Sequence, residues 1–160
     1  MFYIRGRKLW RAKRPADKHK RSWRLPMAVI VHHAADHGPR QNTIKEEASY
    51  LRGIQSFHMG PQRGWSDIAY NYLIMPSGRV WEGRGFGVVG AHAPGWNAQG
   101  IGVCFAGSGD HGLNEKQINA YNNLIRRLKR KGANIVGAKA HGDVYPTSCP
   151  GNGIRKDLGL

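Results

Sequence analysis

Short apolar runs that are typical of buried strands alternate along this chain with segments of helical periodicity. The strand-like runs cover residues 27–31, 70–75, 79–82, 100–107 and 134–137. Two helices are predicted between them, because Thr43 with Glu46 and Asn114 with Gln117 have the spacing of a capping box. This alternation predicts an α/β fold: a single domain with a central mixed β-sheet flanked by α-helices. A chain of 160 residues is long enough to form one such core.

Basic residues are concentrated at the N-terminus. Residues 1–25 carry ten Lys and Arg residues against Asp17 alone, a net charge of +9, whereas the other 135 residues carry +6. Because a dense run of like charges resists compaction, we expect a poorly ordered basic arm over residues 1–25 and a folded domain over residues 26–160.

The charge of this arm indicates polyanionic partners. Anionic cell-wall polymers fit, and so does a membrane surface, because Trp10 and Trp23 interleave with the basic residues. No recognised nucleic-acid-binding motif accompanies the charge, so specific binding of nucleic acid ranks last among these partners. We expect the protein to be a monomer.

The sequence contains little that indicates export or crosslinking. Its two cysteines are too few for the disulfide framework of a small secreted protein, and Cys104 lies in an apolar run that predicts a buried strand residue. The N-terminus lacks the apolar region of about 7–15 residues that a secretory signal requires. We therefore expect the protein to begin in the cytoplasm of the cell that makes it.

Three residues have the chemistry of a zinc site. His32 follows a predicted strand, and His141 and Cys149 bracket a proline-containing loop that could bring both side chains to one ion. A catalytic zinc ion takes three nitrogen or sulfur ligands and leaves a fourth position open. Spacing alone also leaves room for the alternative that these are ordinary polar residues, because no compact pair of cysteines is present.

Four motifs, in order from Val29 to Gly151, resemble the peptidoglycan recognition protein family and the related amidase-type lysozymes of bacteriophages. They are VIVHHAA at 29–35, IQSFHMGPQRGWSDIAYNYLIMPSGRVWEG at 54–83, GAHAPGWNAQGIGVCFAG at 90–107 and AHGDVYPTSCPG at 140–151. The basic arm lies outside this resemblance.

The resemblance implies one catalytic Zn²⁺ ion held by His32, His141 and Cys149. It implies hydrolysis of the amide between N-acetylmuramic acid and L-alanine of bacterial peptidoglycan. Tyr70 matches the catalytic tyrosine of the family, and Thr147 lies where family members carry Thr or Lys. A threonine offers only a neutral hydroxyl, so its contribution should be the smaller one.

Other polar and aromatic residues of the motifs have two interpretations. His58 and His92 match positions near the substrate cleft, where each could bind substrate or form local hydrogen bonds. Trp96 is the aromatic residue that we expect to contact sugar or peptide. His33 should point to the opposite face of its strand from His32, and Asp67 should order a turn.

The sequence therefore predicts a zinc-dependent N-acetylmuramoyl-L-alanine amidase, and the resemblance to phage enzymes suggests a phage or prophage endolysin with bacteriolytic, antimicrobial action. Such a protein would stay in the host cytoplasm until it is released to the cell wall. The alternative is a non-catalytic module that binds peptidoglycan or regulates another protein. Because binding-only members have typically lost the cysteine, Cys149 favours the enzyme.

Overall fold

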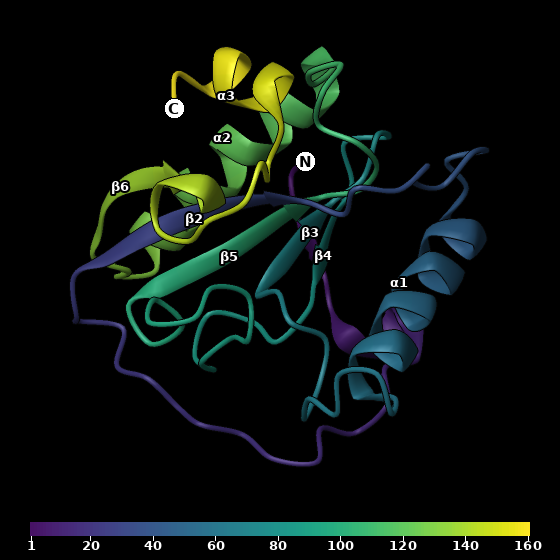
Figure 1. Ribbon diagram of the computed structural model, residues 1–160, viewed down its shortest axis with the longest axis horizontal. Helices are drawn as coiled ribbons and strands as arrows, with labels where there is room; N and C mark the ends of the chain where they lie inside the picture. The colour runs from purple at the N-terminus through teal and green to yellow at the C-terminus, as the bar shows by residue number, and fades with distance from the viewer.

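The computed structural model describes residues 1–160, which form a six-stranded sheet with helices packed on it. Figure 1 shows the elements in order along the chain. They are β1 (Ile4–Arg5), η1 (Arg7–Trp10), β2 (Met27–His33), α1 (Ile44–Met59), β3 (Tyr72–Ile74), β4 (Val80–Glu82), β5 (Gly100–Phe105), α2 (Glu115–Arg130), β6 (Ile135–Ala140), η2 (His141–Asp143) and α3 (Asn152–Leu158). None of the helices is both long and apolar enough to cross a membrane.

The sheet is mixed, as the sequence predicts. Its strand order is β1-β4-β3-β5-β2-β6, and β3 and β4 form the only antiparallel pair. The neighbours β5, β2 and β6 are all parallel, so their carboxyl ends lie at one edge of the sheet. In open α/β sheets, ligands bind outside the carboxyl ends of the strands.

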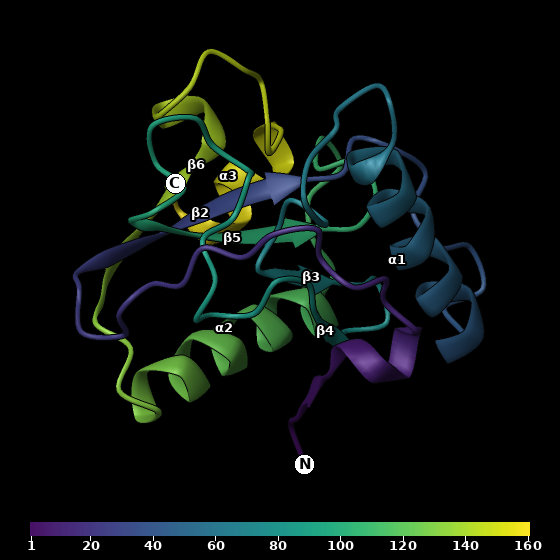
Figure 2. The same cartoon turned by 90° about the horizontal axis from the view of Figure 1, so that it is seen from below.

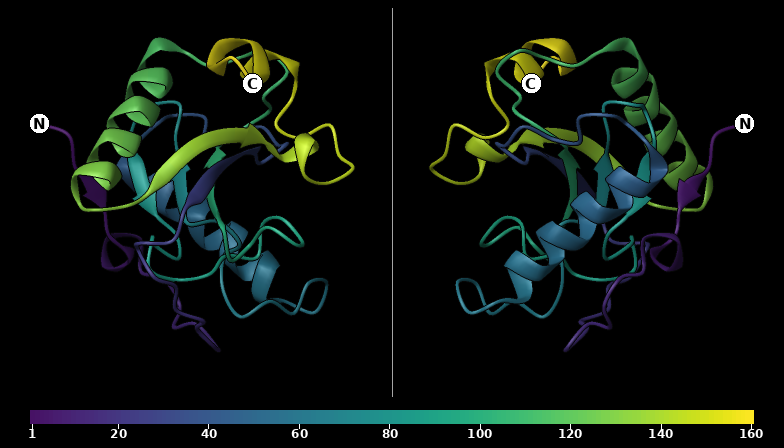
Figure 3. Two further views of the ribbon diagram at one scale, coloured as in Figure 1. Left: turned by 90° about the vertical axis from the view of Figure 1, so that its left-hand side faces the viewer. Right: turned by 90° about the vertical axis from the view of Figure 1, so that its right-hand side faces the viewer.

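Helices cover both faces of the sheet, with α1 on one side and α2 on the other (Figure 3). Alternate residues of β2 therefore enter different cores. Val29 and Val31 join the large cluster with the apolar face of α2, and Ile30 packs with Ala93 on the other side. By the same alternation, the His32 side chain is on the same face of the sheet as Ile30, and the His33 side chain is on the same face as Val29 and Val31.

Both predicted helices begin where the capping patterns place them. The Thr43 hydroxyl accepts a hydrogen bond from the Glu46 backbone amide, and Asn114 and Gln117 form a reciprocal capping box. The strand ends are less well predicted: β6 extends to Ala140, three residues beyond the expected end, and the short helix α3 was not expected. The extension of β6 matters because it delivers His141 to the edge of the sheet.

The N-terminal segment differs from the poorly ordered arm that its composition predicts. It contributes β1 to the sheet edge and η1 beside α1, then runs across the molecule to the start of β2 (Figure 2). Trp10 is fully buried in the cluster under α1, and its indole nitrogen donates to the Glu82 carbonyl at 2.9 Å. Trp23 packs on Phe86 with ring centres 3.9 Å apart.

Charged residues also anchor this segment. Arg7 forms a salt bridge of 2.9 Å with Asp67, whose side chain is only 3% exposed. Gln55 on α1 pairs with both backbone groups of Lys13, at 2.8 and 3.1 Å. Composition misses this packing because the anchors are a few spaced residues whose partners are distant in the sequence.

We predict that Trp10→Ala lowers the free energy of unfolding by about 3–5 kcal/mol, the usual cost of truncating a fully buried aromatic residue. Urea denaturation measures this loss. Leu9→Ala is the matched control, because the neighbouring Leu9 is 58% exposed and its truncation should change stability by about 0.5 kcal/mol or less. Equal stabilities for the two variants would mean that the segment does not pack on the domain.

Candidate metal centre

Parallel pairing of β2 with β6 brings two histidines together. Val31 lies opposite Ala140 in the strand register, so the next residues, His32 and His141, are neighbours at the edge of the sheet. Their ring centres are 4.4 Å apart. His32 is almost fully buried, whereas His141 is half-buried at the start of η2.

The loop after η2 folds back to add Cys149. The Gly142 amide donates to the Cys149 carbonyl at 2.9 Å, which closes the loop between them. The Asp143 carboxylate accepts from the Ala140 amide at 2.9 Å and from Arg155 on α3 at 2.9 Å. These contacts hold the Cys149 sulfur 3.8 Å from Nδ1 of His32.

The three side chains fit a single metal ion. One ligand atom from each of His32, His141 and Cys149 lies within 4.8 Å of the other two. Tetrahedral zinc would place a nitrogen and a sulfur ligand about 3.6 Å apart, given its usual bond lengths. In addition, Nε2 of His141 is inaccessible to solvent and has no hydrogen-bond partner in the protein, as expected of an atom that binds a metal.

Both histidines are neutral near pH 7. Burial, together with the nearby His92 and His141, lowers the pKa of His32 well below its usual range, and burial also lowers the pKa of His141. Burial raises the pKa of the Cys149 thiol to about 11, although a hydrogen bond from the His33 amide opposes this shift. The metal-free site therefore holds two neutral imidazoles and a protonated thiol.

His92 orients His32 from behind. Its Nδ1 lies 3.0 Å from Nε2 of His32, and its own Nε2 lies 3.3 Å from the Gly100 carbonyl. Burial lowers the pKa of His92 to about 3, so the ring is neutral and carries one proton. That proton is on Nε2, which donates to the Gly100 carbonyl. His92 then accepts from Nε2 of His32 and leaves Nδ1 of His32 free to face Cys149. A metal-binding histidine commonly donates its second N–H in this way.

A glycine makes room for this pair. The His92 ring lies on Gly102 of β5, where a Cβ atom would be 2.5 Å from Cδ2 of His92. Any side chain at this position would displace the ring from His32. Both nitrogens of His92 are thus used within the protein, which favours positioning over the substrate contact that we expected.

Tyr70 and His58 line the same cleft as the three candidate ligands. The Tyr70 ring is 5.3 Å from the His32 ring, and burial raises the pKa of its hydroxyl well above the usual value, so it keeps its proton. Nδ1 of His58 accepts from the Ala69 amide at 3.0 Å. Because burial lowers the pKa of His58 to about 4, its single proton is on Nε2 at neutral pH.

Thr147 and Trp96 have different surroundings. Thr147 lines the cleft, and its hydroxyl oxygen accepts from the Cys149 amide at 3.2 Å, so it also orders the Cys149 loop. Trp96 is partly buried against Ala28 and Ile30 and is absent from the cleft wall. The structure therefore favours a packing role for Trp96 over the expected contact with substrate.

The cleft has a volume of about 610 Å³ and includes residues that the sequence did not single out. Arg63 lies with its guanidinium 5.3 Å from the centre of the Trp65 ring. Tyr145 stacks on His141, with ring centres 5.6 Å apart. Asn97 accepts from the backbone amides of His92 and Ala93 and orders their loop. Arg63, Tyr145 and Asn97 all lie within the four sequence motifs, and this position is the signal that could have identified them.

His33, Asp67 and Cys104 take the structural places that the sequence predicts. His33 is one of the residues that line the cleft, but its Nδ1 is already used within the protein, where it accepts from the Gly109 amide at 2.9 Å. Asp67 caps its own turn at the Ile68 amide and binds Arg7. Cys104 is fully buried on β5.

Comparison with known proteins gives consistent matches over most of the chain. Residues 22–152 match the family model described as N-acetylmuramoyl-L-alanine amidase. Peptidoglycan-recognition protein SC2 of Drosophila simulans is 37% identical over 133 residues, covering 81% of this chain and 71% of the relative. The N-acetylmuramoyl-L-alanine amidase of Mus musculus is 32% identical over 148 residues, covering 88% of this chain but 27% of that longer protein.

Solved structures have the same fold. Bumblebee PGRP-SA is 31% identical with a TM-score of 0.90, and the match covers 99% of this chain and 95% of that one. Peptidoglycan recognition protein-LE, solved with tracheal cytotoxin, a monomeric diaminopimelic acid-type peptidoglycan, is 30% identical with a TM-score of 0.86. That match covers 97% of this chain and 91% of that one.

The expected location in the cytoplasm of a host bacterium is wrong. That expectation rested on the missing apolar signal region and on the resemblance to phage lysozymes, whereas these relatives come from fruit fly, mouse and bumblebee. A further match, 27% identical with a TM-score of 0.88, is to the ectodomain complex of peptidoglycan recognition proteins LCa and LCx. An ectodomain lies outside the cell.

We predict that zinc binding releases at least one proton near pH 7, because the metal binds the Cys149 thiolate and the free thiol has a pKa of about 11. Zinc affinity should then rise at least about tenfold per pH unit between about pH 7 and 9, because the histidines stay neutral and a zinc-bound water that ionises near pH 7 adds to the protons released. Calorimetry in two buffers of different ionisation enthalpy counts the protons.

The matched variants are Cys149→Ser and Cys104→Ala. Loss of Cys149 should abolish both tight zinc binding and proton release, whereas loss of the buried Cys104 should leave both intact. Zinc affinity that is independent of pH, or unchanged in Cys149→Ser, would exclude the thiolate as a ligand.

Proposed function

The chain belongs to the N-acetylmuramoyl-L-alanine amidase family, so its function is of the amidase or peptidoglycan-binding kind, and we propose that it is a zinc-dependent amidase. Its substrate is the amide between N-acetylmuramic acid and L-alanine of peptidoglycan. One observation carries the proposal: His32, His141 and Cys149 converge within 4.8 Å at the floor of a cleft that also contains Tyr70.

The metal and the chain have separate tasks in this proposal. Zinc bound there supplies Lewis acidity for the amide carbonyl and brings the pKa of a water molecule toward about 7. Tyr70 keeps its proton and donates a hydrogen bond to the oxygen on which negative charge develops. Thr147 holds the Cys149 loop and offers a weaker, neutral donor beside the cleft.

Other residues of the cleft bind and position. The Nε2 proton of His58 serves as a neutral donor for a carbonyl of the substrate, since its Nδ1 is occupied. Arg63, held over Trp65, suits the carboxylates of the stem peptide. His92 fixes the ring of His32 so that Nδ1 faces the other ligands.

A non-catalytic peptidoglycan-binding module is the second candidate. The relative PGRP-LE was solved with tracheal cytotoxin bound, which favours binding of a peptidoglycan fragment and does not by itself indicate cleavage. Cys149 favours the enzyme, because a pure binder needs no metal-binding thiol beside two neutral imidazoles. The two candidates differ in whether the amide is cut.

The lytic role implied by the resemblance to phage lysozymes stays a prediction, as does a monomeric state. We also propose that the exposed basic residues of the N-terminal segment bind anionic wall polymers or a membrane surface. They are Lys8, Arg11, Lys13, Arg14, Lys18, Lys20 and Arg24. Because such contacts are screened by salt, wall binding that does not weaken as ionic strength rises would contradict this role.

We predict that the zinc-loaded protein releases free stem peptides from purified peptidoglycan, and that a chelator stops the release. Mass analysis of the soluble fragments identifies the bond that is cut. His141→Ala should lower the rate at least about a thousandfold by removing a ligand, and Tyr70→Phe about a hundredfold by removing one donor to the developing charge. His19→Ala is the control, because this histidine is exposed and lies outside the cleft.

Two results would contradict the amidase. Muropeptides that bind without any release of peptide would establish the binding module instead. Fragments cut within the glycan strand or within the stem peptide would show a different hydrolase.

A further inference from the structure

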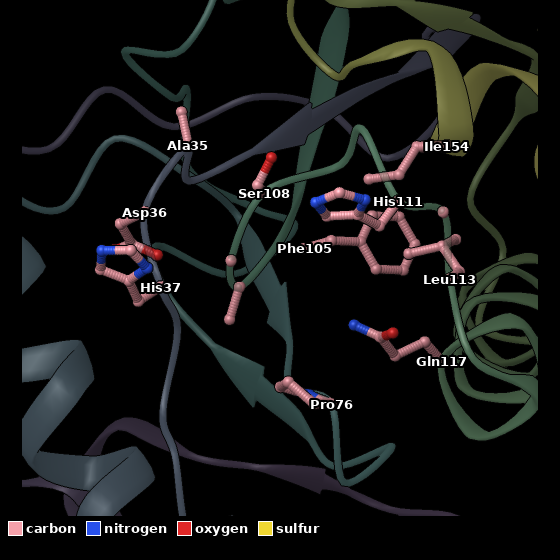
Figure 4. Close-up of a pocket in the computed structure, with 13 residues that line it drawn as sticks. Ala35, Asp36, His37, Pro76, Phe105, Ser108, His111, Leu113, Gln117 and Ile154 are labelled. Carbon is pink, nitrogen blue, oxygen red and sulfur yellow. The ribbon is translucent and has the colours of Figure 1, made fainter.

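A second cavity lies beside the metal cleft. It has a volume of about 560 Å³, opens at the carboxyl end of β5 and the N-terminus of α2, and shares Ala35 with the wall of the cleft (Figure 4). Phe105, Leu113 and Ile154 supply apolar surface, and Ser108 and His111 supply polar groups at its exposed side.

Gln117 points from α2 into this cavity (Figure 4). Its side chain is in the capping box, where Oε1 accepts from the Asn114 amide at 3.1 Å, and the residue is only 6% exposed. Because the oxygen must face that N–H, the orientation of the amide is settled, and Nε2 is the atom left over. No group of the protein accepts a hydrogen bond from Nε2.

Nε2 of Gln117 is not among the buried side-chain atoms without a partner, so it reaches the open cavity, where a ligand or solvent can accept from it. The cavity thus offers a neutral donor next to apolar surface. No lysine or arginine lines it, and the Asp36 carboxylate already accepts from the Tyr50 hydroxyl at 2.9 Å. A cavity without a basic side chain does not suit an anion, and a neutral donor beside apolar surface favours a neutral group that has both a carbonyl and a methyl.

An acetamido group has this combination. Its carbonyl would accept from Nε2 of Gln117, its methyl would pack on Phe105 and Leu113, and the sugar hydroxyls would face Ser108 and His111. We propose that this cavity binds the acetamido group of an N-acetylated sugar in the glycan strand. This inference rests on the proposed function, since it assigns a second part of the same polymer to a site beside the cleft.

The test uses Gln117→Glu, which separates the donor from the cap. A glutamate can still accept from the Asn114 amide and suits a helix N-terminus, but it has no N–H to offer. Glu115→Gln is the matched control, in the same helical turn but outside the cavity. Ser108→Phe is a second variant, which fills the exposed side of the cavity without touching the cap.

The probe is a linear tetramer of N-acetylglucosamine, which lacks a stem peptide and therefore does not depend on the amidase. In NMR titrations the tetramer should shift the side-chain amide signal of Gln117 and the methyl signals of Leu113. Gln117→Glu should weaken binding of the tetramer at least about tenfold because one hydrogen bond is lost, and Ser108→Phe should do the same because the cavity is filled. Glu115→Gln should leave the binding unchanged.

Activity supplies the second readout. The ratio of the amidase rate on long glycan strands to that on a disaccharide-peptide should fall severalfold in Gln117→Glu and stay constant in Glu115→Gln. If the tetramer shifts only signals of the metal cleft, or if Gln117→Glu binds it as well as the unaltered protein, the cavity is not a sugar site. If a sugar-free stem peptide shifts Gln117 instead, the occupant is the peptide and the proposal fails.

The two proposals can fail separately. Tetramer binding that depends on Gln117, in a protein that releases no stem peptides, would keep the sugar site and overturn the amidase. Stem-peptide release without tetramer binding would do the reverse.

Discussion

Parallel pairing of β2 with β5 and β6 is the constraint on which the rest of this structure depends. Because the three strands end at one edge of the sheet, His32 and His141 meet there without help from a long loop. The pairing also places Cys104 beside His32 and leaves the His92 ring packed on Gly102 of β5. The apolar clusters on the two faces of the sheet make this arrangement rigid, so the imidazoles are held before any metal arrives.

Burial then determines the chemistry of the edge. It keeps both candidate histidine ligands neutral and ready to bind a metal, and it keeps Cys149 protonated until a metal replaces the proton. The chain from the Gly100 carbonyl through His92 to His32 selects which nitrogen of His32 faces the site. Hydrogen bonds of 2.9 Å at Asp143 hold the loop that supplies the thiol. The sheet edge, His92 behind His32 and the loop that carries Cys149 thus prepare one position for a cation.

The sequence was most informative where a local rule applied. The caps at Thr43 and Asn114 identified both long helices, and the alternation of β2 separated His32 from His33. It was least informative where long-range packing decides. The role of Trp10 depends on a carbonyl 72 residues away, and the packing of Trp96 depends on the start of β2. Likewise, the partnership of His92 with His32 is invisible in the sequence, because it arises only when β5 lies beside β2.

The central claim is that His32, His141 and Cys149 bind one zinc ion. X-ray absorption at the zinc edge tests it most directly, because sulfur and nitrogen ligands scatter differently. The zinc-loaded protein should show one sulfur at about 2.3 Å and nitrogen ligands at about 2.0–2.1 Å, and the sulfur should vanish in Cys149→Ser. A first shell of oxygen and nitrogen alone in the unaltered protein would contradict the assignment of the site.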